Sequence, residues 1–127
     1  MKPVKVGICG LGTVGGGTFN VLTTNAKNIA RRAGREIIVA QIGTRRPNPD
    51  CDTRNIPMTS DIFEVAKNPD IDVVVELIGG YEVARELVMT AIEHGKHVVT
   101  ANKALIAEHG EEIFALAEAK GVSVMYE

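Results

Sequence analysis

The sequence VKVGICGLGTVG, residues 4–15, leads from a short apolar stretch directly into three glycines with the spacing Gly10-x-Gly12-x-x-Gly15. A strand, a glycine-rich turn and a helix in this order form the pyrophosphate site of many dinucleotide-binding βαβ units. Gly10 permits the tight turn, Gly12 lets the backbone approach the phosphates, and Gly15 lets helix and strand pack closely. The first helical turn offers free N–H groups and the positive end of its dipole to an anion. We therefore predict a dinucleotide site, in preference to an ordinary turn whose glycines serve only local packing.

Length, composition and charge indicate one globular domain. The chain has 127 residues, of which 45% are hydrophobic and 24% are charged, as in ordinary soluble domains. The net charge of −2 and the five aromatic residues without tryptophan do not favour nucleic acid as a partner. No apolar run reaches membrane-spanning length and no basic-then-apolar leader opens the chain, so we expect no membrane contact and a cytoplasmic location. The two cysteines, Cys9 and Cys51, predict neither a disulfide framework nor a metal site, and we expect Cys9 to be a small buried hydrophobe.

Strand and helix patterns alternate along the chain. Strands are expected at residues 2–9, 36–43, 72–78, 96–100 and 122–126, and helices at 13–32, 61–67 (capped by Ser60), 81–94 and 104–120, with an irregular loop at 44–58. This alternation predicts an α/β fold of the Rossmann type over residues 1–127: a doubly wound, mainly parallel sheet in a single three-layer domain. Ligands of such sheets bind outside the carboxyl ends of the strands, which here directs attention to residues 10–15, 43–46, 78–81 and 100–103.

The end of the second expected strand bears on the choice between NAD and NADP. An acidic residue there binds the ribose hydroxyls of NAD, whereas arginine accommodates the 2′-phosphate of NADP. This chain has Gly43-Thr44-Arg45-Arg46 and no acid before Asp50. Guanidinium groups bind phosphate through paired, charge-assisted hydrogen bonds. We predict that NADP(H) is preferred and NAD(H) possible; the alternative is that both arginines are simply solvated.

Three further kinds of ionisable residue stand out. Lys103 follows a strand end directly, so its ammonium would reach the nicotinamide end of the crevice and bind a substrate carboxylate or take part in proton transfer. The alternative is a surface lysine in the first turn of a helix.

Glu76 lies inside an apolar strand, and we favour a paired, partly buried structural carboxylate over a catalytic one. The three histidines lack metal-ligand spacing, and we assign them no chemistry and no metal. His94 and His109 each precede a glycine near a turn, so we expect both to be exposed.

Three motifs together resemble homoserine dehydrogenase. They are Gly10-Leu-Gly-Thr-Val-Gly15, Glu76-Leu-Ile-Gly-Gly80 and Val98-Val-Thr-Ala-Asn-Lys-Ala-Leu105, of which the segment 100–105 is the most specific. The resemblance covers the whole chain. It implies an NAD(P)-dependent oxidoreductase that interconverts L-homoserine and L-aspartate 4-semialdehyde in threonine and methionine biosynthesis.

The resemblance also implies roles for individual residues. It places the glycine turn and the neighbouring side chains against the pyrophosphate and ribose, Arg45 and Arg46 against the adenosine phosphate, and Thr100 and Lys103 at the nicotinamide and substrate end, with Lys103 as a tentative catalytic residue. The expected cofactor contacts are therefore Gly10, Leu11, Gly12, Thr13, Val14, Gly15, Arg45, Arg46, Gly79, Thr100 and Lys103.

Chains of this family continue into a substrate-binding and dimerisation domain. We therefore expect residues 1–127 to be an isolated cofactor domain that binds NADP(H) weakly and turns over no homoserine, because half of the reaction site would be absent. A small-molecule substrate and homo-oligomers are expected only of the longer enzyme. Two alternatives remain open: the cofactor domain of another oxidoreductase, such as an aspartate or sugar dehydrogenase, and a non-catalytic NAD(P)H sensor.

Overall fold

A computed structural model describes residues 3–10, 17, 20, 34, 36–45, 56–78 and 82–126 of the chain. Several predicted cofactor contacts lie outside these described residues, namely Leu11, Gly12, Thr13, Val14, Gly15, Arg46 and Gly79. The others, Gly10, Arg45, Thr100 and Lys103, lie within them. None of the helices within these described residues has the length and hydrophobicity needed to cross a lipid bilayer.

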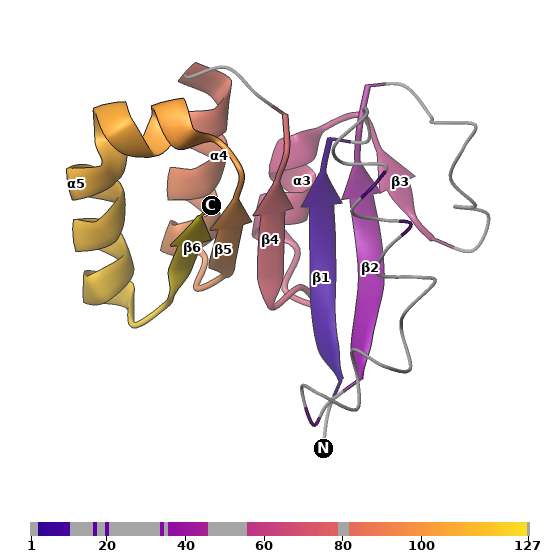
Figure 1. Cartoon of the computed structure of the whole chain (residues 1–127). Helices are drawn as coiled ribbons and strands as arrows, with labels where there is room; N and C mark the ends of the chain where they lie inside the picture. Colours follow the sequence, from indigo (N-terminus) through magenta and orange to yellow (C-terminus); the bar gives the residue numbers. More distant parts are fainter. Residues whose placement is uncertain are drawn as a thin grey trace.

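Among the described residues, six strands form a sheet at the centre of the fold, and every neighbouring pair of these strands is parallel (Figure 1). Its strand order is β3-β2-β1-β4-β5-β6. The strands are β1 (Val4–Cys9), β2 (Ile37–Gly43), β3 (Met58–Thr59), β4 (Val73–Glu76), β5 (His97–Thr100) and β6 (Val124–Tyr126). The predicted parallel α/β sheet of the Rossmann type is thus confirmed. The prediction missed β3, which has only two residues and lies at the end of the region expected to be an irregular loop.

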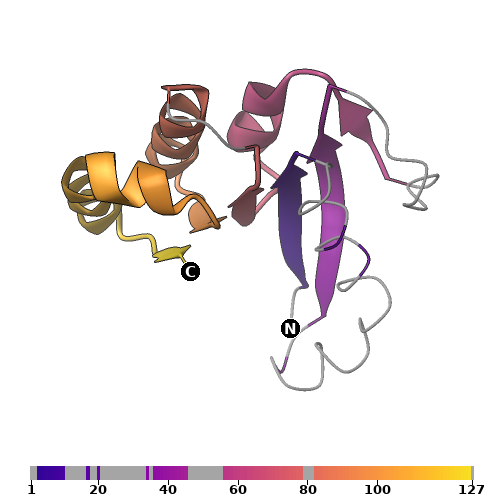
Figure 2. The same cartoon turned by 45° about the horizontal axis from the view of Figure 1, so that its top comes forward.

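Three described helices cover one face of this sheet. They are α3 (Ile62–Lys67), α4 (Glu82–Glu93) and α5 (Lys103–Lys120), and α4 packs between the other two (Figures 1 and 2). Their buried side chains, such as Val65, Leu87 and Ile113, form one apolar cluster with Cys9 and Val74 of the sheet. Since side chains alternate between the faces of a strand, the neighbouring residues Ile8 and Val75 belong to the opposite face.

The opposite face of the sheet carries a second apolar cluster around Val6, Ile8, Ile42 and Val75. We expect the helix predicted over residues 13–32 to cover this face. Within that range Gly17 and Asn20 are helical, and the remaining residues lie outside the described part of the chain. The helical layer on this face, which would be the third layer of the predicted domain, therefore stays a prediction.

Side-chain caps set where two of the helices begin. Asn102 caps α5, because its Oδ1 accepts a hydrogen bond from the Leu105 N–H over 2.9 Å. Helix α3 is capped by Asp61, whose Oδ1 accepts from the Phe63 N–H over 3.0 Å. The prediction of Ser60 as this cap was therefore wrong by one residue. Asp61 has the extended backbone (φ −102°, ψ 101°) that a capping residue adopts.

Candidate functional site

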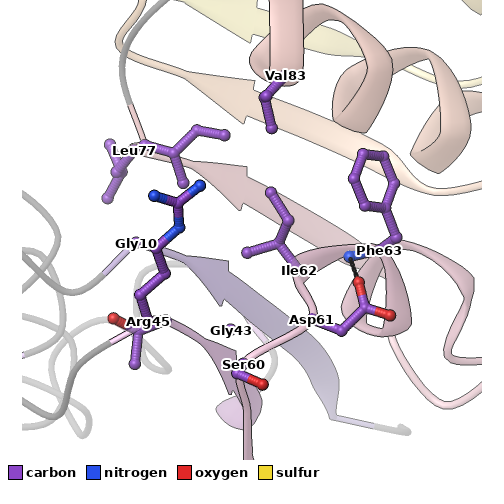
Figure 3. A pocket seen from close by; sticks show the side chains of 11 residues that line it. Gly10, Gly43, Arg45, Ser60, Asp61, Ile62, Phe63, Leu77 and Val83 are labelled. Carbon is purple, nitrogen blue, oxygen red and sulfur yellow. Dashed lines mark hydrogen bonds between the residues drawn. The ribbon is translucent and has the colours of Figure 1, made fainter.

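A pocket of about 650 Å³ lies at the carboxyl ends of β1, β2 and β4 (Figure 3). This is the edge at which parallel α/β sheets bind their ligands. The pocket is lined by backbone from two strand ends, by polar side chains on one side and by apolar side chains on the other. Its described lining residues are Gly10, Gly43, Thr44, Arg45, Ser60, Asp61, Ile62, Phe63, Leu77, Ile78 and Val83.

Two glycines bring the strand ends close together at the pocket. The Gly10 N–H donates to the Gly43 carbonyl over 2.7 Å, which joins the end of β2 to the turn after β1. Gly10 has a φ of +101°, and a Cβ atom there would lie 2.8 Å from the Leu77 carbonyl oxygen. Only glycine fits this position without strain, so the tight turn predicted at Gly10 is confirmed. Its contact with a cofactor stays a prediction.

Arg45 supplies the pocket with a positive charge. Its side chain is exposed and extends from the end of β2 toward Leu77, across the strand ends (Figure 3). A guanidinium in this position offers several N–H donors in a fixed planar arrangement, which suits a phosphate group. The structure therefore brings Gly10 and Arg45, which are far apart in the sequence, to one pocket.

Ser60 and Asp61 form a polar wall of the pocket that the sequence did not predict. The short strand β3 pairs with β2, with Gly43 opposite Thr59, and so brings the start of α3 to the pocket beside Arg45. The Thr59 hydroxyl accepts from the Asp61 N–H over 3.0 Å, which holds this corner in place. A carboxylate and a guanidinium thus line the same pocket. The loop that follows a parallel strand was the signal that could have identified these residues.

Apolar side chains make up the opposite wall. Leu77 follows β4, Val83 belongs to the first turn of α4, and Ile62 and Phe63 belong to the first turn of α3. The Val83 side chain points from α4 toward Ile62 (Figure 3), and Val83 is 46% exposed. This combination of an apolar wall with a few polar groups is typical of small-molecule and cofactor sites.

Thr100 and Lys103 lie outside this pocket, at the end of β5. Because β4 lies between β1 and β5, they stand on the far side of the Gly10 turn from Arg45. Lys103 is exposed and is the first residue of α5. Thr100 is 1% exposed: its hydroxyl donates to Glu76 Oε1 over 2.6 Å and accepts from the Asn102 N–H over 3.0 Å. The edge thus holds two groups of predicted residues, Gly10 with Arg45 and Thr100 with Lys103, separated by the end of β4.

Glu76 and Cys9 are neighbours in the core below this edge. Glu76 is paired, as predicted, but it is completely rather than partly buried, because β1 and β5 flank it on both sides.

Cys9 is also wholly buried, as predicted. Burial, together with the nearby Glu76 carboxylate, raises the pKa of the Cys9 thiol to about 12. At neutral pH this thiol is protonated and acts as a small apolar side chain.

The histidines have local partners in the fold. His97 accepts at Nδ1 from the Ser123 N–H over 3.0 Å, and His94 is exposed, as predicted. His109 is half-buried rather than exposed, because it packs against Glu112 on α5 with 3.2 Å between Nδ1 and Oε1. Among the described residues, no group of three or more histidine, cysteine or acidic side chains could hold a metal ion.

Comparisons with known proteins identify the family. The model of the family described as homoserine dehydrogenase, NAD binding domain, matches residues 10–127. A homoserine dehydrogenase of Pseudomonas aeruginosa is 76% identical over all of this chain and 29% of its own length. The crystal structure of a homoserine dehydrogenase from Thiobacillus denitrificans is 58% identical, with a TM-score of 0.89 over all of this chain and 30% of its own. The crystal structure of a homoserine dehydrogenase from S. aureus is 32% identical, with a TM-score of 0.90. The match covers all of this chain and 33% of the S. aureus chain.

The chain thus spans about a third or less of the length of these relatives. The family model begins at Gly10 and continues through the pocket-lining residues to the last residue. The pocket at the carboxyl ends of the strands therefore lies within the matched region. This chain belongs to the family of homoserine dehydrogenase NAD-binding domains.

Proposed function

We propose that the pocket binds the adenosine half of a nicotinamide dinucleotide, with its pyrophosphate at the turn that begins at Gly10. The observation that carries this proposal is the position of Gly10 and Arg45 in one cavity of about 650 Å³ at the carboxyl edge of the sheet. The apolar wall around Ile62 and Val83 suits an adenine ring, and Ser60 offers a hydroxyl for polar contact. The nicotinamide would then extend across β4 to the end of β5.

The proposed preference for NADP(H) rests on Arg45 and Arg46 at the end of β2. Arg45 lines the pocket with its exposed guanidinium, where it would pair with a 2′-phosphate. Asp61 lines the same pocket, and its negative charge opposes a phosphate, whereas it suits the ribose hydroxyls of NAD(H). We therefore expect a preference for NADP(H) with continued binding of NAD(H), rather than strict selection.

We propose that the longer protein to which this domain belongs interconverts L-homoserine and L-aspartate 4-semialdehyde. The support is the name of a relative that is 76% identical over the whole chain, which favours this reaction over those of other oxidoreductases and over a non-catalytic sensor. When bound, the nicotinamide supplies the hydride donor and acceptor. Thr100 and Lys103 stand where its reactive ring would lie, and the exposed Lys103 ammonium would contact the cofactor or substrate and assist proton transfer.

We further propose that this chain alone binds cofactor without turnover. The relatives are more than three times as long, and the rest of their length would supply the second half of the substrate site. Hydride transfer requires the substrate to be held against the nicotinamide in a near-attack geometry. The homo-oligomeric state and the cytoplasmic location expected of the longer enzyme remain part of the same proposal.

Calorimetric titration tests the cofactor proposal directly. NADPH and NADH are titrated into the wild-type chain and into an Arg45→Ala variant. Arg45→Ala should weaken NADPH binding by roughly tenfold, the loss of about one charge-assisted hydrogen bond, and leave NADH binding nearly unchanged. An unchanged affinity for NADPH would refute the role of Arg45. Substantial homoserine oxidation by the wild-type chain would refute the proposed inactivity.

A further inference from the structure

Glu76 links the two loops at the nicotinamide side of the edge. It is the last residue of β4, and Thr100, directly opposite in register, is the last residue of β5. Its Oε1 accepts from the Thr100 hydroxyl over 2.6 Å, and its Oε2 accepts from the Ile78 N–H over 2.9 Å. One carboxyl group therefore holds the segment after β4 and, through Thr100, the segment after β5.

The hydrogen bonds continue from Thr100 to the start of α5. The Thr100 hydroxyl accepts from the Asn102 N–H over 3.0 Å, and Asn102 Oδ1 caps the helix at the Leu105 N–H over 2.9 Å. Lys103 lies between these two bonded positions. An unbroken series of hydrogen bonds thus runs from the buried Glu76 to the helix turn that carries the exposed Lys103 ammonium.

The complete burial of Glu76 makes this arrangement specific. A buried carboxyl group has a high desolvation cost, which only well-formed hydrogen bonds offset. An apolar side chain at this position would offer no hydrogen-bond acceptor to either Ile78 or Thr100. Both oxygens of Glu76 have partners, and each partner leads to a loop at the edge rather than deeper into the core.

We propose that Glu76 is a positioning residue: directly at Ile78 after β4, and through Thr100 at Asn102 after β5, it holds these two positions in place for the nicotinamide half of the dinucleotide. This inference rests on the proposed function, since it assumes that the adenosine half occupies the pocket by Arg45. It predicts that loss of the Glu76–Thr100 hydrogen bond weakens contacts to the nicotinamide half and leaves contacts to the adenosine half intact.

The experiment compares two ligands on the 127-residue chain by calorimetry. NADPH reports on both halves of the site, whereas 2′,5′-ADP reports on the adenosine half alone. Thr100→Val removes the hydroxyl at nearly constant volume and should weaken NADPH binding roughly tenfold, with less than about a twofold change for 2′,5′-ADP. Glu76→Gln should act in the same direction, because its amide N–H₂ group would face one of the two hydrogen-bond donors.

Two controls separate positioning from general destabilisation. Thr100→Ser keeps the hydroxyl and should restore NADPH binding to the wild-type level. Thr90→Val makes the same chemical change at a half-buried position on α4 and should leave the affinities for both ligands unchanged. Circular dichroism checks that each variant is folded.

The outcomes distinguish the two proposals. Equal weakening of both ligands by Thr100→Val, no weakening of either, or failure of Thr100→Ser to restore binding would overturn the positioning role and leave the proposed function intact. If the wild-type chain bound neither ligand, the proposed function would fail, and this inference would fail with it.

Discussion

Replacement of Gly10 by alanine tests the geometry on which the site depends. Two separate costs are expected. A φ of +101° is a conformation that costs a non-glycine residue about 1–3 kcal/mol. The new Cβ would also lie 2.8 Å from the Leu77 carbonyl oxygen and 3.0 Å from its carbon, and overpacking against such atoms costs about 1–3 kcal/mol. Alanine recovers about 0.4–1 kcal/mol because it restricts the unfolded chain, which leaves a net loss of roughly 1–5 kcal/mol.

Gly95 provides a matched control for the conformational part of this cost. It also has a positive φ, of +76°, but a Cβ at Gly95 would meet nothing within 4 Å. Gly95→Ala should therefore lower the free energy of unfolding by about 1 kcal/mol. This is the strain of a positive φ at alanine, minus the stabilisation that alanine gains by restricting the unfolded chain. The difference between Gly10→Ala and Gly95→Ala isolates the overlap with the Leu77 backbone.

Urea unfolding followed by far-UV circular dichroism measures both variants, since the free energy of unfolding is obtained from the midpoint and the slope. We expect Gly10→Ala to be less stable than Gly95→Ala by at least about 1 kcal/mol, and its affinity for NADPH to fall as the turn shifts. Equal stability of the two variants would refute the argument that Leu77 and Gly10 are held in close backbone contact.

Three other measurements follow from the described contacts. Asp61→Asn keeps the capping oxygen but removes the charge from the pocket, so it should raise the affinity for NADPH relative to NADH; an unchanged ratio in parallel titrations would contradict this. With its pKa near 12, the buried Cys9 thiol should react with Ellman's reagent only after unfolding, which a Cys51→Ser background tests, and rapid labelling of the folded chain would count against it. The Arg85 guanidinium on α4 forms an ion pair with the Glu112 carboxylate on α5 and donates to it over 2.9 Å between Nη2 and Oε2. This hydrogen bond, followed by the charges of Arg85 and His109, lowers the pKa of Glu112. The stabilisation from this pair should therefore be present above the ordinary glutamate pKa and be lost as the pH falls through the lowered value. Urea unfolding should find Glu112→Gln slightly less stable than wild type at neutral pH and equal to it in acid, whereas a constant difference would argue against the ion pair.

Local patterns in the sequence were enough to predict much of the fold. Five of the six strands and the three described helices lie where alternating apolar runs and turn residues predicted them. The turn at Gly10 was predicted as well, and α5, expected from residue 104, begins at Lys103, because a positive φ and a helix start each depend on one or two residues. Such features are local, so the sequence carries them directly.

The missed features depend on pairing between distant parts of the chain. β3 has only two residues, Met58 and Thr59, and shows no periodicity of its own; it is a strand because it pairs with the end of β2. That pairing brings Ser60 and Asp61 to the pocket. The strand pairing also explains why Asp61, and not the predicted Ser60, caps α3. Thr59 of β3 accepts a hydrogen bond from the Asp61 N–H and so holds Asp61 at this corner.

The α/β class, the parallel sheet and the glycine turn at its edge can be predicted from local patterns, because they follow from periodicity and from the conformational freedom of single residues. Which side chains meet at that edge depends instead on contacts between distant parts of the chain. Asp61 joins Arg45 through the pairing of β3 with β2, and Glu76 joins Thr100 because the ends of β4 and β5 lie in register. Strand order and register arise from long-range packing, and they select the partner of each polar side chain.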